Sequence, residues 1–351
     1  MKTFFLGLED RLLIVKEENG AYSSESRLHG TQPTHLAIDS LNSMLIYCST
    51  FGHGLWRSID GGETWTAIGK VTSYHQPDHG KGIRSPHVTF VASQPDKEGN
   101  VWAGTEPSAI YYSEDKGESW RECKSVQNLK SKVNWQFPPR PYTSHVRWIT
   151  PSYTDPSAVS VSIEFGALIR SFDGGHTWKD RPFGSPLDAH TLLAHPNQPG
   201  TLYAACGDGF MIKGHSYAES HDDGETWNYD SEGLEEHPYL YNMVLHPHDP
   251  NEKLVAAAAS PSTGHHASLF STIYRKQGDQ KWEELSDGVE CEGAYLAALA
   301  ADQKDPGCFY AFNNFGMYRL NAGERHWSQL PVEWETEFRN QHPSFLILKT
   351  S

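Results

Sequence analysis

One eight-residue pattern occurs four times in the sequence and constrains the fold more than any other feature. Each copy has the form Ser-x-Asp-x-Gly-x-Ser/Thr-Trp, and the copies occupy residues 58–65, 113–120, 171–178 and 220–227. An Asp side chain can accept a hydrogen bond from the backbone two residues on, and Gly readily adopts positive φ. A Trp after the turn supplies a large apolar surface for packing between sheets. The pattern therefore predicts four copies of one tight turn that joins two strands.

The spacing of these copies indicates a repeat fold. Their Asp residues stand at 60, 115, 173 and 222, so the steps are 55, 58 and 49 residues. Before the first copy, the alternating runs 34–39, 44–49 and 54–58 are typical of strands. The same order of three runs precedes the other copies. Repeats of about this length are small sheets that bury their faces only against one another, so we predict four-stranded blades.

Three further blades are predicted from weaker signals. Segments 241–282 and 295–327 each end on a Trp but lack the Ser-x-Asp start. Residues 342–350 resemble an inner strand with no partner after it, whereas 3–8 and 11–16 resemble second and third strands with no inner strand before them. Pairing the two ends would remove an exposed sheet edge. We predict an all-β, seven-bladed β-propeller that covers residues 1–351 as one domain. A six-bladed ring with a terminal hairpin is the alternative.

The repeated pattern resembles the Asp-box, or BNR repeat, of sialidase-like β-propellers. This resemblance implies that the turns are structural and lie on the rim opposite the starts of the inner strands. True sialidases of this kind also carry a Phe/Tyr-Arg-Ile-Pro motif and an arginine triad. Gly82-Ile-Arg-Ser-Pro86 is the nearest trace of the motif. No triad is readable, so sialidase activity is not expected.

Charge and composition exclude several classes of partner. A net charge of −15 disfavours nucleic acid and anionic membranes, since there is no basic stripe to displace counterions. No apolar run approaches the ~18 residues of a membrane span. The five cysteines form no CxxC pair, and the apolar run before Glu9 is too short for a signal peptide. We expect a reduced, cytoplasmic protein that is a monomer or a small homo-oligomer, because a closed propeller has no free edge strand.

Histidines mark the starts of the predicted inner strands. Five of the seven blades have a histidine at this position, and the other two have Tyr241 and Tyr295. The turns between the second and third strands carry Glu9, Glu106 and Glu164 on the same rim. Imidazoles that converge on an axis, with carboxylates behind them, suit a divalent transition metal such as Fe, Mn, Zn or Cu. The arrangement is similar to that of carotenoid-cleavage oxygenases and virginiamycin B lyase. The predicted metal ligands are His35, His87, His145, His190 and His342.

These features favour a metal-dependent lyase, hydrolase or oxygenase that acts on a small polar or sugar-like substrate. Glu106 and Glu164 are candidate catalytic carboxylates, and Tyr142 and Arg84 come from the connections 121–144 and 66–86, which are predicted to cover the same rim. One alternative is a glycoside hydrolase that uses Glu106 and Glu164 as its carboxylate pair. Another is a non-catalytic binding or assembly propeller, similar to photosystem assembly factors that carry the same boxes. The pair His265-His266 is interpreted as part of a loop or turn.

Overall fold

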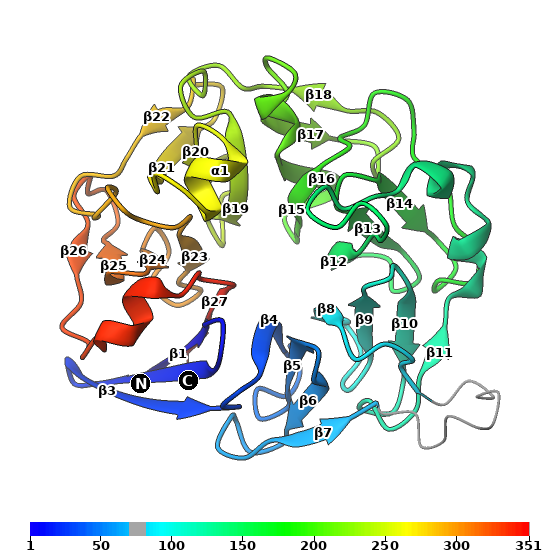
Figure 1. Ribbon diagram of the computed structural model, residues 1–351, viewed down its shortest axis with the longest axis horizontal. Helices are drawn as coiled ribbons and strands as arrows, with labels where there is room; N and C mark the ends of the chain where they lie inside the picture. The colour runs from blue at the N-terminus through cyan, green and yellow to red at the C-terminus, as the bar shows by residue number, and fades with distance from the viewer. Residues whose placement is uncertain (70–81, 351) are drawn as a thin grey trace.

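The computed structural model describes residues 1–69 and 82–350 and is a seven-bladed β-propeller whose blades are arranged around a central axis (Figure 1). The prediction of seven blades is confirmed, and the six-bladed alternative is wrong. Residues 70–81, part of a connection predicted to cover the channel, lie outside the described residues. No helix among the described residues is long and apolar enough to cross a membrane. All five cysteines are unpaired.

Blades 1 to 3 follow one another along the chain. Blade 1 comprises β4 (Gln32–Ile38), β5 (Ile46–Phe51), β6 (Gly54–Ser58) and β7 (Thr66–Ile68). Blade 2 comprises β8 (Val88–Ser93), β9 (Val101–Thr105), β10 (Ile110–Ser113) and β11 (Arg121–Glu122), and two 3-10 helices follow, η1 (Lys124–Asn128) and η2 (Lys130–Asn134). Blade 3 comprises β12 (Val146–Pro151), β13 (Val159–Ile163) and β14 (Ala167–Ser171), and a bridge between Arg170 and Lys179 stands where its fourth strand would be.

Blades 4 to 6 continue the ring. Blade 4 comprises β15 (Ala189–His195), β16 (Gln198–Cys206), the 3-10 helix η3 (Asp208–Phe210), β17 (Tyr217–Ser220) and β18 (Asn228–Tyr229). Blade 5 comprises β19 (Tyr239–Leu245), β20 (Glu252–Ala258), helix α1 (Pro261–His265), β21 (Thr272–Gln277) and β22 (Glu283–Glu284). Blade 6 comprises β23 (Ala298–Ala301), β24 (Phe309–Asn313), β25 (Gly316–Leu320) and β26 (Ser328–Gln329).

The two ends of the chain form blade 7 and close the ring. Its strand order is β27 (Leu346–Thr350), β1 (Lys2–Gly7), β2 (Leu12–Glu18) and β3 (Ala21–Arg27). The 3-10 helix η4 (Thr336–Asn340) leads into β27, which pairs with β1 so that Leu346 lies opposite Leu6. The predicted closure is confirmed. The fourth strand, β3, had not been predicted, because only one of its seven residues is fully apolar.

The repeated eight-residue pattern forms the same turn in all four copies. In the first copy, Ser58 Oγ accepts from the backbone N–H of Gly62 at 2.8 Å, and Asp60 Oδ1 accepts from that of Thr64 at 2.9 Å. The Trp65 indole N–H donates to the Gly62 carbonyl at 3.0 Å. The same three contacts recur in the other copies, beginning at Ser113, Ser171 and Ser220. Each turn follows the third strand of its blade and therefore lies on the rim opposite the inner-strand start.

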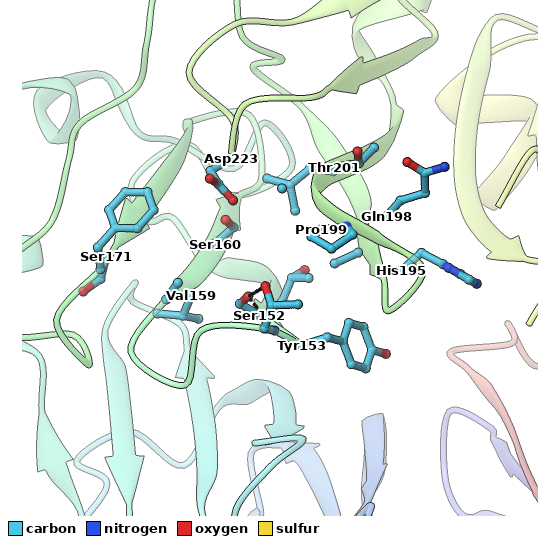
Figure 2. A pocket seen from close by; sticks show the side chains of 17 residues that line it. Ser152, Tyr153, Val159, Ser160, Ser171, His195, Gln198, Pro199, Thr201 and Asp223 are labelled. Carbon is cyan, nitrogen blue, oxygen red and sulfur yellow. Dashed lines mark hydrogen bonds between the residues drawn. The ribbon is translucent and has the colours of Figure 1, made fainter. Parts of the chain in front are cut away.

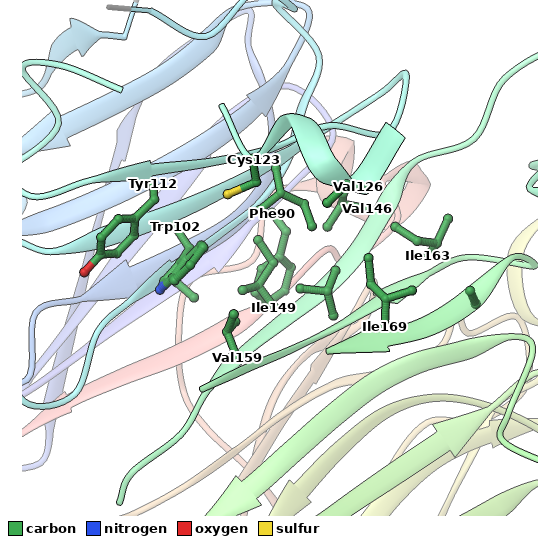
Figure 3. Close-up of a cluster of buried hydrophobic side chains, with 14 of the residues drawn as sticks. Phe90, Trp102, Tyr112, Cys123, Val126, Val146, Ile149, Val159, Ile163 and Ile169 are labelled. Carbon is green, nitrogen blue, oxygen red and sulfur yellow. The ribbon is translucent and has the colours of Figure 1, made fainter. Parts of the chain in front are cut away.

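Apolar side chains from adjacent blades fill the space between them. Figure 3 shows one such cluster, in which Phe90 and Trp102 of blade 2 lie near Ile149 and Val159 of blade 3. All four side chains are almost fully buried. In the same way, Trp120 of the second repeated turn shares a buried cluster with Tyr47 and Ile68 of blade 1. The predicted packing role of the turn Trp is thereby shown at Trp120.

Removing one turn carboxylate tests the role of these turns in stability. Asp115 accepts hydrogen bonds from Ser113, from the Ser119 hydroxyl and from the Ser119 backbone. We expect Asp115→Ala to lower the free energy of unfolding by about 1–3 kcal/mol, because these donors lose a charged acceptor. Glu114→Ala, which removes the exposed carboxylate next to it, should change stability by less than about 0.5 kcal/mol. Urea unfolding curves of the two variants measure the difference, and equal curves would contradict the role assigned to the turn.

Candidate functional site

A β-bulge near the start of the inner strand recurs in blades 1 to 5. In β4, Pro33 and His35 pair with consecutive residues of β5, so Thr34 is an extra residue without a partner. The corresponding extra residues in the next four inner strands are Thr89, Arg147, His190 and Tyr241. A bulge turns a side chain out of its regular alternation and can aim it toward a site. All five of these bulge residues line the central cavity.

Hydrogen bonds between blades hold this ring in register. The Thr34 hydroxyl donates to the Val88 carbonyl at 2.8 Å, and the Thr89 hydroxyl donates to the Val146 carbonyl at 2.7 Å. His190 Nδ1 donates to the Leu240 carbonyl at 2.6 Å. In each case the acceptor is the residue just before the bulge of the next blade. In these three blades, the bulge side chain therefore donates a hydrogen bond to a backbone carbonyl group of the next blade.

The cavity at the channel mouth has a volume of about 680 Å³. It is bordered by the inner-strand starts, by the turns after the second strands and by helix α1. Its wall carries carboxylates, imidazoles, arginines and aromatic rings. The residues that line the cavity include Glu9, Phe51, Glu106, Phe137, Arg140, His145, Arg147, Glu164, Asp188, His190, Tyr239, Tyr241, His265 and His342.

Glu164 lies between three cationic or imidazole groups. Its Oε2 is 2.9 Å from His145 Nε2 and 3.3 Å from Arg147 Nε. Burial by itself would raise the pKa of this carboxyl group, but His145, His190 and Arg147 together lower it well below its usual range. Glu164 is therefore an ionised carboxylate near neutral pH, and it is suited to accept a proton or to bind a cation.

Glu106 and Arg140 form a bidentate ion pair at the cavity wall. Arg140 Nε and Nη2 donate to the two oxygens of Glu106 at 2.9 and 2.7 Å. The guanidinium group also lies 4.7 Å from the centre of the Phe137 ring and 5.2 Å from that of Phe51. His145 Nδ1 is 3.6 Å from Glu106 and has no hydrogen-bond partner. Glu106 thus positions Arg140 rather than presenting a free carboxylate.

Asp188 and His190 project from the start of β15 on the same side as Glu164. One ligand atom from each of these three residues lies within 4.8 Å of the other two. Asp188 Oδ1 accepts from the Phe165 backbone N–H at 3.1 Å, and Asp208 accepts from the Asp188 N–H at 2.8 Å. The orientation of Asp188 is therefore set by backbone contacts with two neighbouring loops.

A directional chain of hydrogen bonds crosses the opposite wall. His342 Nδ1 is 2.6 Å from the Pro343 carbonyl, to which it must donate, so its Nε2 accepts from His265 Nδ1 at 2.6 Å. His265 Nε2 then accepts from the Tyr239 hydroxyl at 3.1 Å. Desolvation lowers the pKa of His342 to about 4 and that of His265 well below its ordinary value. Both imidazole rings are neutral at pH 7, as the direction of these hydrogen bonds requires.

The structure brings some of the predicted residues together and leaves others apart. Of the five predicted metal ligands, His145, His190 and His342 line the cavity. His35 follows its bulge by one residue, donates to the Val91 carbonyl and stacks on Phe90 at 3.8 Å. His87 precedes its bulge by two residues and packs against Phe51. Glu106 and Glu164 line the cavity. Tyr142 is 85% exposed outside it, and Arg84 is 3.7 Å from Glu122.

Sequence reasoning missed Asp188 and His265 as cavity residues. Asp188 had one available signal, its position two residues before His190, which had already been named. His265 was interpreted as a loop residue, whereas it ends helix α1 and faces His342. Its approach to the channel depends on a short helix capped by Ser260 and Thr263, and no strand periodicity indicates such an element.

A second, much smaller pocket lies between blades 3 and 4 (Figure 2). Its volume is about 30 Å³, and the side chains of Ser152, Tyr153, Ser160 and His195 contribute to its wall. That volume corresponds to one or two water molecules. This pocket is therefore too small to hold a sugar.

Comparisons with known proteins support a propeller related in shape to glycoside hydrolases. No protein-family model matches the chain. A xyloglucanase from Hypocrea jecorina (strain QM6a) is 26% identical over 260 residues, which cover 65% of this chain and 29% of that relative. The chain therefore spans less than a third of the length of this curated relative.

Among solved structures, an ancestral GH74 enzyme has a TM-score of 0.63 at 13% identity, with coverage of 87% of this chain and 39% of that chain. The structure described as YCF48 bound to D1 peptide has a TM-score of 0.59 at 17% identity, with coverage of 88% and 82%. At such identities the likeness shows the fold alone.

Titration of His342 provides a test of the hydrogen-bond chain. Its pKa is about 4 in the folded state, below the value of about 6.5 for an unfolded histidine. The unfolded state then binds more protons between these values, so this residue favours folding at pH 7 and its contribution is lost as pH falls from about 6.5 toward 4. We expect His342→Gln to lose less stability than the wild type between pH 7 and 5.

Urea midpoints measured at several pH values check this expectation. His29→Gln is the matched control, because His29 is exposed. Its pH dependence should follow that of the wild type. An unchanged pH dependence in His342→Gln would contradict the assignment of a neutral, desolvated ring.

Proposed function

We propose that the central cavity is the active site of a glycoside hydrolase. The observation that carries this proposal is a pair of cavity carboxyl groups whose pKa values are displaced in opposite directions. Glu9 has a raised pKa, caused first by desolvation and then by Asp10, although the His342 backbone N–H lowers it. The pKa of Glu164 is lowered by its imidazole and guanidinium neighbours. Opposite displacement of this kind separates a proton donor from a proton acceptor.

The two carboxyl groups would divide the reaction between them. Glu9, which retains its proton to higher pH, donates that proton to the leaving glycosidic oxygen. Glu164, which is ionised, acts on the other side of the sugar as the base that accepts a proton from water, or as the nucleophile. Both side chains come from turns after the second strand of their blades, and both line the same cavity. Glu106, the other predicted carboxylate, holds Arg140 in place.

The cavity wall suits a neutral sugar. Phe51, Phe137 and Tyr241 give the wall an apolar surface, although each ring has a guanidinium group over it. Arg140 and Arg147 are already paired with Glu106 and Glu164. Because both guanidinium groups are neutralised, the wall favours hydroxyl groups and apolar sugar faces over a carboxylate or phosphate. The similarity to a xyloglucanase supports the same substrate class.

Replacing each carboxyl group separately tests the assignment. We expect Glu164→Gln and Glu9→Gln each to lower kcat for xyloglucan oligosaccharides or aryl glycosides by about 10²–10⁴-fold, because each removes one proton-transfer group. Glu9→Gln should also remove the basic limb of the pH–rate profile, since that limb reports loss of the acid's proton.

The control for these variants is Glu236→Gln, a change of an exposed carboxylate outside the cavity. It should retain the wild-type rate. Full turnover by either cavity variant, or a folded wild type that cleaves no glycoside in the panel, would refute the proposal.

A non-catalytic binding propeller is the second candidate. It is supported by the similarity to YCF48, which extends over most of both chains, whereas the GH74 enzyme is matched over 39% of its length. Phe210, Met211 and Ile212 are about half exposed in the connection between β16 and β17, on the rim that carries the inner-strand starts. Under this candidate, Phe210→Ser would weaken binding to an array of extended peptides, and Glu164→Gln would leave glycosides uncleaved as in the wild type.

A further inference from the structure

We propose that Glu164, Asp188 and His190 form a binding site for a divalent metal cation. One oxygen from each carboxylate and one imidazole nitrogen lie within 4.8 Å of one another. A cation with bond lengths of about 2.0–2.2 Å to oxygen and nitrogen requires only small side-chain movements to contact all three atoms. This set replaces the predicted ring of five histidines, and only His190 belongs to both.

The orientation of His190 provides the main argument. The side chain is 1% exposed, and its Nδ1 donates to the Leu240 carbonyl. In a neutral ring, Nε2 then carries a lone pair instead of a proton. This nitrogen has no hydrogen-bond partner and is 3.5 Å from Asp188 Oδ1, beyond normal hydrogen-bond length. A buried lone pair that faces two carboxylates is unfavourable unless a positive species lies between them.

Two positive species could fill this role: a metal cation or a second proton on His190. A carboxylate oxygen of Asp188 and one of Glu164 both lie within 4.8 Å of a His190 ring nitrogen, so their negative charges favour a positive charge at this point. A donor set of two carboxylates and one imidazole is one that Mn²⁺ and Zn²⁺ accept. Three protein ligands facing a cavity also leave coordination positions for water or substrate.

The contacts around the three residues are those expected of a prepared metal site. Each proposed ligand is held by a second group: Glu164 by His145 at 2.9 Å, Asp188 by the Phe165 N–H at 3.1 Å, and His190 by the Leu240 carbonyl. Such outer contacts fix the ring tautomer and the carboxylate orientation before a metal binds. Gly207 lies against both Asp188 and His190, so any larger residue there would displace them.

A cation at this position would also deepen the proposed hydrolysis. With a cation bound, Glu164 would serve as its ligand, and the lowered pKa of a metal-bound water would replace activation of that water by Glu164. Metal binding itself is measured without substrate, so the two proposals fail independently. A protein that binds metal but cleaves no glycoside refutes hydrolysis alone.

Calorimetric titration of MnCl₂ and ZnCl₂ into chelator-dialysed protein tests the site. We expect one equivalent to bind to the wild type, and we expect Asp188→Asn and His190→Gln to weaken binding by at least about 10–100-fold. His87→Gln is the matched control, because His87 also stands near an inner-strand start but lies against Phe51, outside the cavity. It should bind as the wild type does.

Two results would overturn the proposal. One is a wild type that binds neither ion, and the other is binding that persists in Asp188→Asn and His190→Gln, as metal on surface histidines would. If both variants fail to fold, the ¹⁵N shift of His190 Nε2 in the wild type decides. A change to the metal-bound value on adding Zn²⁺ supports the site, whereas an imidazolium signal that Zn²⁺ leaves unchanged refutes it.

Discussion

Closure of the ring is the constraint on which the rest of the structure depends. The antiparallel pairing of β1 with β27 joins the first and last strands of the chain in one sheet, which is the seventh blade. Because the seven sheets are arranged around one axis, the turns after their second strands meet at one rim. Glu9, Glu106 and Glu164 lie far apart in the sequence, yet they face one cavity for this reason. Opening the ring would separate Glu9 and His342 from the residues of blades 3 to 5.

The bulges then decide which side chains enter the channel. In a regular strand, alternate residues face one side, and a single extra residue shifts that alternation. Blades 1 and 2 place Thr34 and Thr89 at the bulge, and each hydroxyl is satisfied by a carbonyl of the next blade. Blades 3 to 5 place Arg147, His190 and Tyr241 there. These longer side chains bring a guanidinium, an imidazole and a phenol group to the cavity wall.

The blade count and the carboxylates could be predicted from the sequence, because both depend on local patterns. The repeated turn marks the third strand of each blade, and its position relative to Glu106 and Glu164 is constant. The inner ring could be predicted only in part. An alignment of the inner strands on their histidines places His145 at the position of His190. An alignment on the observed bulges places Arg147 at that position instead. The bulge position is set by hydrogen bonds between blades, and such long-range contacts leave no signal in a single strand.

Electrostatic balance explains why the cavity keeps several buried titratable groups that would otherwise be costly. Each arginine is matched to one carboxylate, Arg140 to Glu106 and Arg147 to Glu164, which leaves Asp188 without a matching guanidinium group. The unpartnered nitrogens of His145 and His190 are also found on this side of the channel. Hydrogen-bond acceptors therefore outnumber donors around Asp188 and His190. Backbone groups hold both side chains in place, Asp188 through the Phe165 N–H and His190 through the Leu240 carbonyl, so rotation of either side chain would break one of these contacts. A metal cation between these groups, as we propose, would balance this excess of acceptors.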